Sequence, residues 1–159
     1  MKNHQIDFKS LERSHWTAKQ SDNANLVVNF VQGIMNDHDF EYISSTFGGK
    51  PYIQHNRNMP DGLDGLLGYF RKFVKIFPEF NYDVKKIIVD DDLVSLHSHA
   101  TLRKKHRGNQ SKGFNIIDTW RVEDGKLVEH WDAVQAIDLP MRLYSAAVGG
   151  RTINKNGFF

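Results

Sequence analysis

The stretch GFNIIDTWRV (residues 113–122) alternates apolar and polar side chains, which is the pattern of a β-strand with one covered face. Asp118 lies on the apolar face of this strand. The other members of that face are Phe114, Ile116, Trp120 and Val122. An unpaired charge in apolar surroundings is costly, so the carboxyl group must be paired, hydrogen-bonded or protonated. The fold built around this strand therefore has to explain Asp118.

Turn signals place further strands on both sides of this one. The expected neighbours span residues 81–89, 93–102 and 126–137. DDD (90–92) is a plausible tight turn, and the Asp-Gly pair in EDG (123–125) is the strongest short hairpin signal. These short connections predict an antiparallel sheet that runs as hairpins from residue 81 to residue 137.

The first half of the chain has helical periodicity instead. The expected helices span residues 21–35, 39–47 and 61–77. Ser21 or Asp22 is expected to cap the first helix, and KPYIQHN (50–56) reads as a short strand. Helices that precede an antiparallel sheet indicate an α+β fold. We predict a cone-shaped, curved antiparallel sheet with the N-terminal helices over its concave face, enclosing a pocket.

Length and composition are those of one ordinary globular domain. We expect a single domain over residues 1–159, with an extension at 1–20 and a tail at 138–159, in which Pro140 ends the regular structure. Hydrophobic residues make up 40% and charged residues 25%, and no apolar run approaches the ~20 residues that a membrane helix needs. The N-terminus lacks the apolar segment of a secretory signal. We therefore expect a cytoplasmic protein without membrane contact.

Charge and cysteine content exclude several further classes. A formal net charge of +2 is too small to indicate nucleic-acid binding, and the basic segment 103–113 reads as a solvated hairpin loop. The chain contains no cysteine, so it has neither disulfides nor a thiolate metal site.

Two histidines stand two residues apart in the strand 93–102. His97 and His99 share one face of that strand, and Val94, Leu96 and Ala100 lie on the other. If this strand pairs with 113–122, we expect both histidines to lie near Asp118. A carboxylate that holds an imidazole can transfer protons near neutral pH, and a purely structural polar pair is the alternative.

The His-x-His pattern also allows a metal site. Two strand histidines and a carboxylate can form a facial triad, which Asp118, His55 or His130 could complete. The segment HSHATLRKKH lacks the glutamate that a cupin site would place a few residues after the pair. Because no spacing fixes the remaining ligands, we expect no bound metal.

Several segments together resemble a known family. YIQHN (52–56), DGLDGLLGYF (61–70), LVSLHSH (93–99) and IIDTWRVEDGKLVEHWDAVQ (116–135) are similar to the SnoaL-like polyketide cyclases, in the branch of predicted aldol-condensation enzymes. The resemblance covers roughly residues 20–137. It implies the cone fold of the nuclear-transport-factor-2-like superfamily, in agreement with the element order above.

The resemblance also implies a chemistry. An aspartate on the strand before the last hairpin is the acid/base group of characterised cyclases, and it matches Asp118. The family uses no metal or organic cofactor. Its polar pocket groups match His55, Asn56 and one of His97 and His99. Arg57 departs from the pattern, because relatives usually have proline there.

We expect an aromatic wall around this pocket. Its members would be Tyr52, Phe70, Trp120 and Trp131, with Trp131 chosen although either face of 126–137 could line the cavity. The function hypothesis is a cofactor-independent acid/base enzyme acting next to a carbonyl, by aldol condensation, cyclisation or isomerisation. The alternative is a ligand carrier or an interaction protein that uses the same cavity. Because Val94, Leu96 and Ala100 are expected on an outer face, we also predict a homodimer.

Overall fold

The computed structural model describes residues 4–49, 51–149 and 152–158. Its helices are α1 (Phe8–Leu11), α2 (Ala18–Val31), α3 (Phe40–Phe47), α4 (Gly62–Ile76) and α5 (Leu139–Val148). A π-helical turn, η1 (Gln32–Asp37), extends α2, and a 3₁₀ turn, η2 (Lys104–His106), lies in the basic loop. The strands are β1 (Ile53–Gln54), β2 (Asn81–Asp90), β3 (Leu93–Thr101), β4 (Phe114–Glu123) and β5 (Lys126–Ala136).

The strands form one open sheet with the order β1-β5-β4-β3-β2. The four long strands pair antiparallel as consecutive hairpins, as predicted, whereas β1 pairs in parallel with β5. At the β4–β5 turn both Asp124 and Gly125 have positive φ, which is the backbone that an Asp-Gly hairpin turn requires. The α+β class is confirmed, and the sheet is mixed rather than purely antiparallel.

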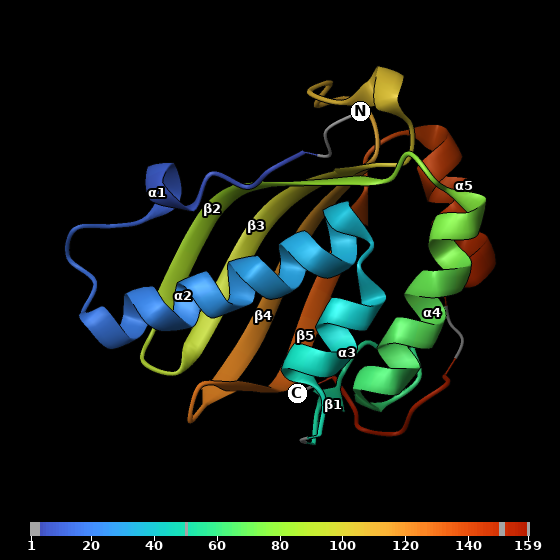
Figure 1. Cartoon of the computed structure of the whole chain (residues 1–159). Helices are drawn as coiled ribbons and strands as arrows, with labels where there is room; N and C mark the ends of the chain where they lie inside the picture. Colours follow the sequence, from blue (N-terminus) through green and yellow to red (C-terminus); the bar gives the residue numbers. More distant parts are fainter. Residues whose placement is uncertain (1–3, 50, 150–151, 159) are drawn as a thin grey trace.

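The helices lie across one face of this curved sheet (Figure 1). The apolar stripes of α2 and α4 pack on the sheet, with Val27, Val31 and Leu67 fully buried. Helix α2 begins earlier than the helix expected at 21–35, because Thr17 and Gln20 form a capping box at its start. Neither Ser21 nor Asp22 caps it. None of the helices in the described ranges is long and apolar enough to cross a membrane.

Two of the expected segments, the short strand at 50–56 and the tail at 138–159, differ from the structure. The strand expected at 50–56 is reduced to Ile53–Gln54, and Lys50 lies outside the described residues. In the expected tail, Pro140 stands in the first turn of α5, where its missing N–H costs nothing. Residues 139–148 are therefore helical.

The inward face of β3 is the apolar one. Val94, Leu96 and Ala100 are completely buried, and Leu96 stands directly opposite Asp118 in the β3–β4 ladder. The expectation that these three residues form an outer face is wrong, because the helices cover them. The argument for a homodimer that rested on them is lost with it.

Candidate active site

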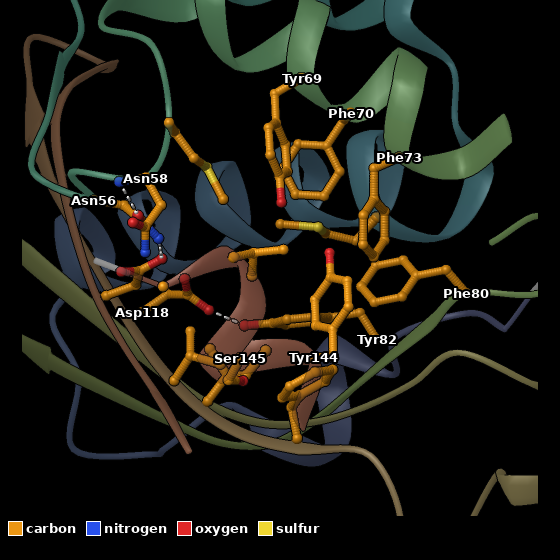
Figure 2. A pocket seen from close by; sticks show the side chains of 18 residues that line it. Asn56, Asn58, Tyr69, Phe70, Phe73, Phe80, Tyr82, Asp118, Tyr144 and Ser145 are labelled. Carbon is orange, nitrogen blue, oxygen red and sulfur yellow. Dashed lines mark hydrogen bonds between the residues drawn. The ribbon is translucent and has the colours of Figure 1, made fainter. Parts of the chain in front are cut away.

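A cavity of about 320 Å³ lies between the concave face of the sheet and the helices α4 and α5. Its wall is largely aromatic, as Figure 2 shows. The rings come from Tyr69, Phe70, Phe73, Phe80, Tyr82, Phe114 and Tyr144. The lining contains two carboxyl groups, those of Asp118 and Asp132. The cavity thus has a largely apolar wall and one acidic end.

Asp118 is held from two sides at that end. The Tyr82 hydroxyl donates a hydrogen bond to Oδ2, and Nε2 of His130 lies 3.1 Å from Oδ1. The side chain is 5% exposed. Burial raises the pKa of the Asp118 carboxyl to about 6, and the hydrogen bond and charge of His130 oppose the rise. The carboxyl group can therefore gain and lose a proton near neutral pH.

The orientation of His130 follows from Gln54 behind it. Nδ1 of His130 lies 3.0 Å from Oε1 of Gln54, and the same oxygen accepts the backbone N–H of Asn56 at 2.8 Å. Because a backbone donor fixes this oxygen as an acceptor, Nδ1 of His130 has to carry a proton. Nε2 then faces Asp118 either as the acceptor of a carboxyl proton or, in the imidazolium, as a donor to the carboxylate.

Asp132 is the second carboxyl group at the acidic end. It stands directly opposite Asp118 in the β4–β5 ladder, and its Oδ2 accepts a hydrogen bond of 2.6 Å from Nδ2 of Asn56. Asp118, His130 and Asp132 each place one ligand-type atom within 4.8 Å of the others. These three are the described side chains that could hold a metal ion. Such an ion would have to replace the His130–Asp118 hydrogen bond, and the absence of a metal stays a prediction.

Two phenols lie at the opposite wall. The side chains of Tyr69 on α4 and Tyr144 on α5 both point into the cavity (Figure 2). Burial raises the pKa of the Tyr69 hydroxyl to about 12, and Tyr144 beside it acts in the same direction. Tyr69 is therefore a neutral hydrogen-bond donor at physiological pH.

Asn56 and Asn58 form a polar rim of the cavity, and Ser145 of α5 also belongs to the lining. Their loop is fixed by the C-terminal segment, because Nδ2 of Asn154 donates to the carbonyl oxygens of Asn56 and Met59 at 2.8 and 2.9 Å. Asn154 is itself buried. The segment expected as a tail thus contributes both a wall and an anchor of the site.

The structure contradicts the expected approach of His97 and His99 to Asp118. In the β3–β4 ladder they stand opposite Ile117 and Asn115, whose side chains leave the sheet on its convex face. Nε2 of His97 contacts Oδ1 of Asn115 at 2.6 Å, and Nε2 of His99 contacts the carbonyl oxygen of Lys112 at 2.7 Å. The reason is hydrophobic: burying the apolar side of β3 turns its histidines outward.

The choice of Trp131 for the cavity wall is also wrong. Trp131 stands opposite Thr119 on the convex face, where the guanidinium of Arg121 lies 5.6 Å from its ring centroid. A β-bulge at Val128 causes the difference. Leu127 points inward, and strict alternation from it would bring Trp131 inward as well. The extra residue reverses the alternation, so that His130 and Asp132 point inward instead.

His55 turns away from the main cavity. Its Nε2 lies 2.9 Å from Oε1 of Glu129, and its ring stacks on Trp131 with the centroids 5.0 Å apart. It lines a neighbouring hollow of about 340 Å³ that shares Asn56 and Asp132 with the main cavity. Of the expected rim residues, Asn56 therefore lines the cavity and His55 does not.

Three expected wall residues have different places. Phe70 lines the cavity, whereas Tyr52 and Trp120 are buried behind it. Nε1 of Trp120 donates to the Tyr52 hydroxyl at 3.2 Å, and the Trp120 ring lies 4.7 Å from that of His130. The rings of Tyr52 and Trp120 therefore pack against the ring of His130, and neither residue belongs to the cavity lining.

Sequence reasoning named His130 only as a possible metal ligand, and it missed Asp132 and Tyr82 as members of the site. The segment EHWD (129–132) held the first two, and their shared face was one of the two alternatives for this strand. Tyr82 lies at the start of β2, 36 residues from Asp118, and no local pattern connects them. Only the pairing of β2 with β3 carries its hydroxyl over Asp118.

The sequence model of one protein family matches residues 25–141, and that family is described as SnoaL-like polyketide cyclase. The chain belongs to this family. The resemblance stated from the motifs is thereby confirmed. No curated protein matches this SnoaL-like chain.

Solved structures confirm the fold. A candidate polyketide cyclase from Bacillus cereus ATCC 10987 is 20% identical with a TM-score of 0.64, covering 88% of this chain and 89% of that one. AclR, a candidate hydroxylase from Streptomyces galilaeus, is 19% identical with a TM-score of 0.58, covering 82% and 86%. An NTF2-like protein of unknown function from Cytophaga hutchinsonii ATCC 33406 is 14% identical with a TM-score of 0.55, covering 77% and 94%. At these identities the likeness shows the NTF2-like cone fold, and it fixes no reaction.

Proposed function

We propose that this SnoaL-like protein is a cofactor-independent acid/base enzyme that acts next to a carbonyl group of a small conjugated molecule. The reaction would be an aldol condensation, a cyclisation or an isomerisation, each of which begins with proton transfer next to a carbonyl. The observation that carries the proposal is the place of Asp118 at the end of an aromatic cavity, where burial raises the pKa of its carboxyl group to about 6.

The lining also supports a class of substrate. Among the described residues, no lysine or arginine side chain lines the cavity, whereas two carboxyl groups do. An anionic substrate would meet like charges without compensation, so a neutral molecule fits better. The aromatic rings suit a flat, conjugated ring system, and about 320 Å³ is at the lower end of ligand-pocket volumes.

Deuterium exchange tests the proposal without knowledge of the natural substrate. The probe is 2-tetralone, a neutral bicyclic ketone with exchangeable C–H groups next to its carbonyl. Its exchange in D₂O is followed by ¹H NMR, and its binding by saturation-transfer NMR. We expect the protein to accelerate exchange over buffer, and Asp118→Asn to lose about 100-fold of that rate while binding the ketone.

Glu123→Gln is the matched control, because it makes the same change of carboxylate to amide at an exposed position of the same strand. It should exchange 2-tetralone at the wild-type rate. An Asp118→Asn variant as fast as the wild type would refute the role of Asp118. If the ketone binds but its exchange is not accelerated, the carrier alternative is favoured. If the ketone neither binds nor exchanges faster than in buffer, the proposed substrate class is refuted.

We further propose that residues 1–159 act as one cytoplasmic domain and assemble into a homodimer. Support for assembly now comes from the convex face of the sheet, where Ile88 and Ile117 are 62% and 40% exposed. Sedimentation equilibrium at micromolar concentration should give twice the chain mass of 18.4 kDa. A monomer would refute this part.

A further inference from the structure

Two phenol hydroxyl groups lie in the otherwise apolar wall opposite Asp118. Tyr69 comes from α4 and Tyr144 from α5, and Figure 2 shows both side chains in the cavity with their hydroxyl groups facing each other. Phenylalanine would be sufficient for an apolar wall, as at the neighbouring positions Phe70 and Phe73. A hydroxyl group in apolar surroundings is costly unless it is hydrogen-bonded, so the two phenols require a reason beyond packing.

Aromatic neighbours hold the rings of both tyrosines. The Tyr69 ring stacks on Phe73 with the centroids 6.1 Å apart. The Tyr144 ring contacts Phe77 edge-on, with the centroids 5.9 Å apart. Rings that are packed in this way lose little conformational freedom when a ligand arrives. The two hydroxyl groups are therefore positioned in advance for hydrogen bonding.

One hydroxyl hydrogen of this pair has no acceptor within the protein. A phenol hydroxyl both donates one hydrogen bond and accepts. The Tyr144 hydroxyl is the side-chain hydrogen-bond partner of Tyr69, and after burial it contributes to the raised pKa of Tyr69. Across the described ranges, no backbone carbonyl, carboxylate or amide oxygen accepts from either phenol. Two hydroxyl hydrogens thus share one bond, and the second hydrogen is available to an oxygen atom inside the cavity.

We propose that Tyr69 and Tyr144 form an oxygen-binding subsite, and that the substrate carries a neutral acceptor oxygen, of carbonyl or ether type, remote from the reacting carbonyl. This inference rests on the proposed function, and it narrows the substrate class to flat ketones with a second oxygen. A site built to hydrogen-bond one group of a substrate discriminates against an analogue without it, because the polar group of the protein is then left unpaired.

The charges around the subsite favour a neutral acceptor. Asp132 is close enough to Tyr69 for its negative charge to raise the pKa of the phenol. Among the residues that the structure describes, no lysine or arginine side chain lines this cavity. A carboxylate or phenolate of the ligand would therefore be repelled without a cation to compensate.

The alternative is that the two phenols only tie α4 to α5. Removing one hydroxyl group would then weaken the packing of the two helices. The affinity would decrease to the same degree for every ligand of the cavity, with or without a second oxygen. A loss of affinity that is confined to ligands with the second oxygen distinguishes a subsite from such a tie.

The experiment compares four neutral ketones in two matched pairs, 6-methoxy- with 6-ethyl-2-tetralone and 7-methoxy- with 7-ethyl-2-tetralone. Each methoxy group has an ether oxygen on the aromatic ring, away from the ketone, and each ethyl group has nearly the same size without an acceptor. Dissociation constants are measured by saturation-transfer NMR titration. We expect the wild type to bind at least one methoxy ketone about fivefold more tightly than its ethyl counterpart.

Tyr69→Phe and Tyr144→Phe each remove one hydroxyl group and keep the ring. Each variant should bind the methoxy and ethyl ketones of that pair about equally. Tyr42→Phe is the matched control, because it removes a phenol hydroxyl of α3 that lies outside the cavity lining, at a position 42% exposed. The control should keep the fivefold preference.

A wild type without the preference, or a preference that both cavity variants retain, would overturn the subsite. An equal loss of affinity for all four ketones would overturn it as well and favour the tie between the helices. Deuterium exchange of 2-tetralone, which has no second oxygen, tests the proposed function separately. If the wild type prefers a methoxy ketone without accelerating exchange, the proposed function fails and the subsite is supported. If no ketone binds, both fail.

Discussion

The buried carboxyl group of Asp118 should make the protein less stable at neutral pH than it would be with an amide at this position. The side chain introduced by Asp118→Asn can reproduce the hydrogen bonds of a protonated aspartic acid: its oxygen accepts from the Tyr82 hydroxyl, and its amide donates to Nε2 of a neutral His130. It carries no charge to desolvate. We therefore expect Asp118→Asn to stabilise the protein above pH 6.

The magnitude follows from the pKa of Asp118, which is about 6 in the folded protein against an ordinary value of 3.8. The folded state then binds the proton more tightly than the unfolded state, so stability decreases as the pH rises through these two values and is level above about pH 7. A shift of about two units corresponds to about 3 kcal/mol. Roughly half of this, about 1.5 kcal/mol, is lost between pH 5 and pH 8.

Equilibrium urea unfolding followed by tryptophan fluorescence at pH 5, 6, 7 and 8 measures the effect. The free energy of unfolding of Asp118→Asn minus that of the wild type should increase by about 1.5 kcal/mol over this range and be level above pH 7. For Glu123→Gln the same difference should be independent of pH. A constant difference for Asp118→Asn, or one that decreases with pH, would show that the pKa of Asp118 is not raised. The same variant should also lose its acceleration of 2-tetralone exchange. Asp118 would then be a group that function requires although its carboxyl group lowers the free energy of unfolding.

Two further predictions concern residues outside the cavity. His97→Ala and His99→Ala should exchange 2-tetralone within about twofold of the wild-type rate, because both side chains lie on the convex face; a 100-fold loss, as for Asp118→Asn, would contradict the β3–β4 register. Gly113→Ala should lower the free energy of unfolding in urea by about 3 kcal/mol or more, since φ is +88° and a Cβ would lie 2.1 Å from the Ala100 carbonyl oxygen. Gly108→Ala, with φ of +75° but open space around it, should cost only about 1 kcal/mol, and equal losses would contradict this close approach.

Local patterns in the sequence determined the order of the elements. Helical spacing predicted α2, α3 and α4, and period-two alternation with an Asp-Gly turn predicted the hairpins from β2 to β5. The same alternation placed Asp118 on a buried face, where the structure has it. These features depend on neighbours within a few residues, so the sequence alone contains enough information to define them.

Only the tertiary structure decided which residues surround Asp118. Alternation identifies the two faces of a strand without saying which one faces the core, and β3 turned its apolar side inward and its histidines outward. On β5, one extra residue at Val128 exchanged the faces, so that His130 and Asp132 replaced Trp131 beside Asp118. Tyr82 and the residues of α5 reach the cavity from distant parts of the chain. Such neighbours are selected by the pairing and packing of whole elements, because burying the largest apolar area fixes the register that brings them together.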